Sequence, residues 1–148
     1  MKVSFKYGLA GYTGKTDGLV YCYNRHTGKV YARHKSNPRL TKENERIGKM
    51  SKNIFGLKPS AAYKDDLQLY CMRYNGLRNN QEKRIGSWVN LYVILMTNMA
   101  KAMPNINLNT ITRAEIYQND LPCQNIKKAV EAGILSPVEG YERLTALL

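Results

Sequence analysis

The residues of this chain whose types could bind a phosphate lie in a glycine-rich segment at residues 8–16. The segment reads GLAGYTGKT, follows a predicted strand at residues 3–7 and ends in Gly-Lys-Thr. A phosphate-binding loop also needs a glycine five residues before the Gly-Lys pair, and Leu9 stands there. It needs a helix that begins at the lysine, whereas Asp17 and Gly18 predict a turn into another strand. We therefore interpret the segment as a turn between strands and not as a nucleotide site.

Metal-ligating side chains are few and widely spaced. Cys22, Cys71 and Cys123 include no Cys-x-x-Cys pair, which indicates buried free thiols in a reducing compartment. His26 and His34 lie close to Cys22 along the chain, but these three residues fall short of the four ligands of a structural zinc site. The sequence therefore predicts no metal and no other cofactor.

Catalytic groups do not form a recognisable arrangement either. Asp65 and Asp66 are adjacent, so they cannot share one face of a helix. No serine or cysteine pairs with a histidine in the pattern of an activated nucleophile. We therefore predict that the protein is not an enzyme, and the sequence identifies no small-molecule substrate.

The element that would position the basic side chains is a hairpin at residues 19–33. Two runs rich in β-branched and aromatic residues, LVYCY and KVYAR, flank a polar connection that ends in Gly28. A five-residue connection gives the cross-strand pairs Tyr23–Lys29, Tyr21–Tyr31 and Leu19–Arg33 on one face, and Cys22–Val30 and Val20–Ala32 on the other. A four-residue connection would mix the two classes of side chain, so the pattern favours five.

Positive charge is concentrated in the first part of the chain. The net charge of the 148 residues is +12. Residues 1–58 contribute +10, residues 59–100 contribute +2 and residues 101–148 contribute none. This asymmetry favours an anionic partner, although a basic face can also be merely solvated.

We predict a nucleic-acid-binding surface on the hairpin and beside it. Cations would hold phosphates, and they are Lys15, Arg25, Lys29, Arg33, Lys35 and Arg39. Aromatic rings would stack on unpaired bases, and they are Tyr21, Tyr23 and Tyr31. Tyrosine pairs across a hairpin are equally typical of ordinary sheet packing.

Helical periodicity dominates the chain after Pro38. Thr41 caps a first helix with the apolar stripe Ile47, Met50, Ile54 and Leu57 and with lysines and arginines on its other side. Ser60 caps a second helix, whose tyrosines we assign to the edge of the core. A third helix is predicted at residues 81–103. It is apolar around most of its circumference, so we expect it to be the central core helix, with Trp88 buried, or an oligomer contact.

The last part of the chain contains two capping boxes. They are Thr112-x-x-Glu115 and Ser136-Pro137-x-Glu139. A short helix is predicted at residues 122–132, stopped by Gly133, and a last helix at residues 137–148. The outline of helix, turn and helix is also that of a DNA-reading motif, but this part of the chain carries no net charge.

Several N-terminal motifs occur together in one order. They are Gly-aromatic-Thr-Gly-Lys at residues 11–15, Val20, GKVYAR at residues 28–33, Asn37-Pro38, and Thr41 with Asn44 and Arg46. This order resembles the opening of a family of small uncharacterised proteins in bacterial and phage genomes. That family has a Gly-x-x-Ser-Gly-Lys turn, a strand ending Tyr-x-Arg and a Thr-x-x-Gln-x-x-Arg helix start. The resemblance covers about the first third of the chain and implies a phage-like or mobile-element context.

Together these patterns predict an α+β protein with a small N-terminal antiparallel sheet packed on four to five helices. We expect one domain, residues 1–148, with a basic β-rich part at residues 1–38 and a helical part at residues 41–148. The predicted function is non-enzymatic binding of nucleic acid, in a phage-like nucleoprotein or virion. The alternative is a structural subunit of a phage-like or filamentous assembly, a homo-oligomer or larger, that makes protein contacts through its helical part.

The expected location follows from what the N-terminus and the apolar runs lack. The first residues, MKVSFKYGLAGYTG, contain no apolar core of a signal peptide. The most apolar run, residues 88–99, is broken by Asn90, Thr97 and Asn98 and is too short to cross a bilayer. We therefore expect a cytoplasmic or virion-associated protein that makes no membrane contact.

Overall fold

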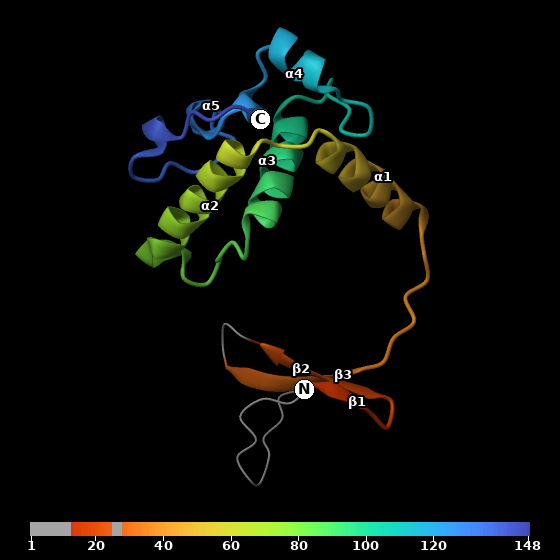
Figure 1. Ribbon diagram of the computed structural model, residues 1–148. Coiled ribbons are helices and arrows are strands. Elements are labelled where there is room, and N and C mark those ends of the chain that lie inside the picture. The colour runs from red at the N-terminus through yellow and green to blue at the C-terminus, as the bar shows by residue number, and fades with distance from the viewer. Residues whose placement is uncertain (1–12, 25–27) are drawn as a thin grey trace. The chain divides into compact units, whose positions relative to one another are not determined.

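The chain folds into two compact units, Met1–Leu40 and Thr41–Leu148. The computed structural model (Figure 1) describes residues 13–24 and 28–148. The first unit contains a three-stranded antiparallel sheet, and the second contains five α-helices and three short 3₁₀ turns within the described residues. The predicted α+β class is therefore confirmed. The predicted strand at residues 3–7 lies outside the described residues, as does the glycine-rich segment up to residue 12.

The sheet has the order β1-β2-β3, with strands Gly14–Thr16, Leu19–Asn24 and Lys29–His34. Asp17 and Gly18 connect the first two strands, with φ of 50° and 75°. Positive φ at both central residues is the geometry of a tight hairpin turn. The turn at Asp17 and Gly18 is as predicted, but Gly14-Lys15-Thr16, which was interpreted as part of a turn, forms strand β1 instead. It does not begin a helix.

The hairpin between β2 and β3 is present, but the predicted register was wrong by one residue. Asn24 pairs with Lys29, so residues 25–28 form a four-residue connection. Gly28 closes it with φ of 64° and with a backbone N–H that donates to the Asn24 carbonyl at 2.8 Å. The resulting pairs are Tyr23–Val30, Cys22–Tyr31, Tyr21–Ala32, Val20–Arg33 and Leu19–His34. The first four of these pairs therefore join side chains that were predicted to lie on different faces.

The first two helices begin at the predicted caps. Helix α1, Lys42–Gly56, has Thr41 as N-cap, and α2, Ala61–Gly76, has Ser60 as N-cap. Both caps accept a hydrogen bond from the backbone N–H three residues later, which satisfies a donor that the helix itself leaves unpaired. Tyr63 and Tyr70 of α2 are fully buried, so they lie inside the core and not at its edge as expected. Tyr74 is partly buried.

Helix α3, Trp88–Ala102, begins later than predicted. Ser87 has an extended backbone and caps it, and residues 78–80 form a separate 3₁₀ turn. The segment before the cap is held away from helical geometry by Asn75, whose side-chain amide bonds both backbone groups of Ile85 at 2.8 and 2.9 Å. Trp88 is the first residue of the helix and is only partly buried, which corrects the expectation that it is buried in the core.

The rest of the chain departs further from prediction. Helix α4, Arg113–Gln118, has the predicted capping box of Thr112 and Glu115. The predicted helix at residues 122–132 is divided into a 3₁₀ turn, Pro122–Gln124, and α5, Ile126–Glu131, because Asn125 has an extended backbone and caps α5. The predicted last helix is absent: Gly140 has φ of 70°, and only Tyr141–Arg143 form a 3₁₀ turn.

Long-range hydrogen bonds replace helical ones in this C-terminal segment. The backbone N–H of Ala146 donates to the Asp66 carboxylate at 2.9 Å, and that of Leu148 donates to the Gln124 carbonyl at 2.9 Å. Leu148 itself is fully buried. The segment therefore satisfies its backbone groups through tertiary contacts, which local propensity cannot reveal.

The hydrophobic core of the helical unit centres on α3. Five of its residues, Leu91, Tyr92, Leu95, Met96 and Met99, are fully buried. They pack with residues from α1, α2, α4, α5 and the C-terminal segment in one cluster. Over residues 13–24 and 28–148, no helix combines the length and apolar character needed to cross a membrane.

Candidate nucleic-acid interface

The observed register gathers three cations on one face of the sheet. Lys15 is opposite Val20 and Val20 is opposite Arg33, so these residues form one row across all three strands. Side chains opposite each other in an antiparallel sheet point to the same face. Alternation along β3 adds Lys29 and Tyr31 to that face. We call it the basic sheet face, and it comprises Lys15, Val20, Cys22, Asn24, Lys29, Tyr31 and Arg33.

Burial along β3 shows which face is accessible. Lys29, Tyr31 and Arg33 are exposed, whereas Val30 and Ala32, which alternate with them, are buried. Lys15 is exposed as well. Along β3, therefore, the cations and Tyr31 are accessible, whereas the apolar residues between them are not.

The three tyrosines do not share a face as predicted. Tyr31 lies on the basic sheet face, but Tyr21 pairs with Ala32 and Tyr23 with Val30, on the opposite face. The cause is the four-residue connection, which shifts β2 by one position against β3. The β2 residues on the basic sheet face are instead Val20, Cys22 and Asn24. None of the three was predicted to lie on this face. The only signal that pointed to them was the shorter connection, which the apolar pattern disfavoured.

The other predicted cations lie beyond the strands. The Lys35 N–H donates to the Gly18 carbonyl at 2.8 Å, which continues the β2–β3 register by one residue, and alternation then gives Lys35 the same face as Arg33. Arg39 is in the exposed segment between β3 and α1. Arg25 lies outside the described residues.

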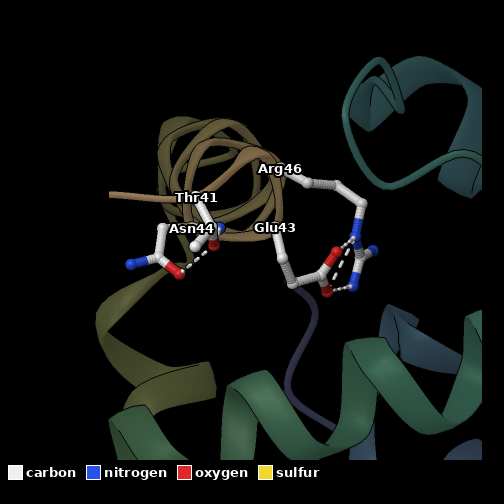
Figure 2. A network of polar contacts seen from close by, with 4 residues as sticks. All are labelled: Thr41, Glu43, Asn44 and Arg46. Carbon is white, nitrogen blue, oxygen red and sulfur yellow. Dashed lines mark hydrogen bonds and ion pairs between the residues drawn. The ribbon is translucent and has the colours of Figure 1, made fainter. Parts of the chain in front are cut away.

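The basic side of α1 contains one cation that already has a partner. Figure 2 shows the Arg46 guanidinium beside the Glu43 carboxylate, with Nε 2.9 Å from Oε2. The hydrogen bond from Arg46 holds the pKa of Glu43 below its usual range, and the bond to Glu43 raises the pKa of Arg46. The Thr41 hydroxyl also donates to the Asn44 side-chain oxygen at 2.9 Å (Figure 2). This network stabilises the first turn of the helix, so Arg46 is a poor candidate for an external anion.

All three cysteines are free thiols. Cys71 and Cys123 are buried, and burial raises the pKa of Cys71 to about 11 and of Cys123 to about 12, so both stay protonated near neutral pH. Cys22 is half-buried on the basic sheet face. In the part of the chain that the structure describes, no group of three or more His, Cys, Asp or Glu side chains could hold a metal ion.

Comparison of the chain with protein-family models, curated proteins and solved structures found no match. The resemblance of the N-terminal motifs to small phage-associated proteins therefore stays an expectation.

Proposed function

We propose that the protein binds nucleic acid through the basic sheet face, without catalysing a reaction, in a phage-like nucleoprotein or virion. The observation that carries this proposal is the row of Lys15, Val20 and Arg33 across the sheet, with Lys29 and Tyr31 exposed beside it. A sheet face with several cations and an accessible ring suits a phosphate backbone and the bases attached to it.

The charge of the sheet unit supports an anionic partner. Residues 1–40 contain eight lysines and arginines and one acidic residue, Asp17. None of the ion pairs among the described residues involves a cation of the basic sheet face. Cations that form no ion pair keep their field available for phosphates.

Salt titration tests the proposal. If about five cations of residues 15–39 contact phosphates, log affinity for duplex DNA should fall against log salt concentration with a slope of about −4.5 or steeper, and about −3.5 or steeper on a single strand. Fluorescence anisotropy with duplex DNA, single-stranded DNA and RNA of equal length measures these slopes. An affinity that does not change with salt, or no binding in about 50 mM salt to any of the three, contradicts the proposal.

A matched pair of tyrosines tests which face is used. Tyr31 is 41% exposed on the basic sheet face and Tyr23 is 39% exposed on the other. If bases stack on Tyr31, Tyr31→Ala should weaken single-strand binding by about 1–3 kcal/mol. Tyr23→Ala removes an equally exposed ring and should leave binding unchanged. Equal losses in the two variants would show that the face is wrongly assigned.

One observation favours the alternative function, a subunit of an assembly. The outer face of α2 exposes Leu69 at 38% and Met72 at 66%, and Leu77 follows at 41%. Exposed apolar side chains in one region are typical of protein contacts. Light scattering of nuclease-treated protein, with and without added nucleic acid, distinguishes the two functions, because only an assembly subunit forms large particles without nucleic acid.

A further inference from the structure

An open groove lies in the helical unit between α1 and the segment that leads into α4. Its volume is about 690 Å³, which is in the range of ligand sites and far larger than a single ion needs. Two buried apolar residues, Leu57 and Ile111, contribute to its lining. Lys49 and Lys52 line it from α1, and Arg113 lines it from the start of α4.

The two walls of this groove are joined by one side chain. The amide nitrogen of Asn53, on α1, donates to the carbonyl of Leu108 and to that of Ile111, both at 3.0 Å. These bonds connect residues that are more than fifty positions apart in the chain. The groove is therefore preformed, because α1, which carries two of its cations, and the segment before α4, which leads into the third, are held at a fixed distance from each other.

All the charged residues that line the groove are basic. Its lining contains three cations and no acidic residue. Within the described residues, Lys49, Lys52 and Arg113 form no ion pair. The Arg113 guanidinium lies 5.9 Å from the centre of the Tyr117 ring. The nearby carboxylate of Glu115 accepts a hydrogen bond from the Thr112 backbone at 2.8 Å, as part of the α4 cap. The groove thus presents uncompensated positive charge beside an apolar surface.

We infer that this groove is a second binding site for the phosphodiester backbone of the nucleic acid, an inference that rests on the proposed function. Lys49 and Lys52 hold phosphates from the α1 wall and Arg113 holds one from the opposite wall. Sugars lie against Leu57 and Ile111. Because the helical unit and the basic sheet face are on one chain, binding at one raises the local concentration of phosphates at the other.

The test uses the full-length Lys52→Gln/Arg113→Gln variant and a fluorescein-labelled DNA duplex. Loss of two phosphate contacts should reduce the salt slope by about 1.8 and lower affinity about 60-fold in about 0.1 M salt. The control variant, Arg78→Gln/Lys101→Gln, removes two exposed charges elsewhere in the helical unit and should bind like the parent. A second variant, Lys49→Gln/Lys52→Gln, leaves the α4 cap and Arg113 unchanged and should lose a similar amount of affinity for the duplex. It shows that a loss of affinity in the first variant does not come from misfolding around Arg113.

The outcomes separate this inference from the proposed function. If the parent binds DNA and both groove variants keep its slope and affinity, the groove is not a site and the inference is overturned, while the function of the sheet stands. If the groove and control variants lose affinity equally, the effect is one of net charge and the inference is again overturned. If neutralising the basic sheet face has no effect while the groove variants lose binding, the groove is a site and the sheet assignment fails.

Discussion

The Leu95→Ala variant is expected to lose about 2–5 kcal/mol of unfolding free energy, because a fully buried leucine leaves a cavity when it is truncated. Leu95 lies on α3 in the centre of the core, and its neighbours Tyr92 and Met96 are fully buried as well. The hydroxyl of Tyr92 donates to the Ile54 carbonyl at 2.9 Å, which ties α3 to α1 and limits how far the core can collapse around the cavity. Urea denaturation followed by circular dichroism measures the change.

The matched variant is Trp88→Ala at the first position of the same helix. The Trp88 ring is only partly buried, and the Lys64 ammonium lies 5.5 Å from its centre. Its truncation should therefore cost less than that of Leu95, although tryptophan is the larger residue. If Trp88→Ala is the more destabilising change, or if Leu95→Ala unfolds like the parent, the core is not organised around α3 as described.

Patterns that depend on neighbours in the chain predicted the local structure well. The caps of α1, α2 and α4 at Thr41, Ser60 and Thr112 were read correctly, because a cap is a contact between residues three positions apart. The Asp17-Gly18 turn has the same local origin. These elements needed no information from the rest of the fold.

Elements set by distant contacts were predicted poorly. The late start of α3 depends on the bonds from Asn75 to Ile85. The absence of a last helix depends on the left-handed Gly140 and on acceptors as distant as Asp66. The third helix was predicted from an apolar period that includes Ile85, and the last helix from the Ser136-Pro137-x-Glu139 capping box. Neither local signal reports the distant contacts that delay α3 and prevent a last helix.

In the candidate site, too, some features could be predicted from the sequence and others depend on contacts between distant residues. Its cations Lys15, Lys29 and Arg33 were identified from composition, and they do share a face. The tyrosines were misplaced because the side-chain pattern was used to choose the connection length, and a difference of one residue moves every side chain of a strand to the other face. The groove at α1 joins residues 49–57 to residues 109–113, and no sequence pattern links them.

The largest expected effect on binding belongs to the Lys15→Gln/Lys29→Gln/Arg33→Gln variant. All three side chains are exposed and neutral glutamine suits an exposed strand position, so the sheet should still form. Each phosphate contact lowers log affinity by about 0.9 for each tenfold rise in salt, so losing three contacts should weaken duplex binding about 500-fold in about 0.1 M salt. The slope itself should become shallower by about 2.7.

The control for this variant is Arg78→Gln/Lys83→Gln/Lys101→Gln, which removes the same charge from exposed positions of the helical unit. Long-range attraction by net charge weakens similarly in both proteins, whereas direct phosphate contacts are lost in only one. We therefore expect the control to keep the slope of the parent. If the two triple variants bind DNA with the same affinity and slope, the basic sheet face makes no direct contact with phosphates, and the helical unit becomes the remaining candidate for the protein's interactions.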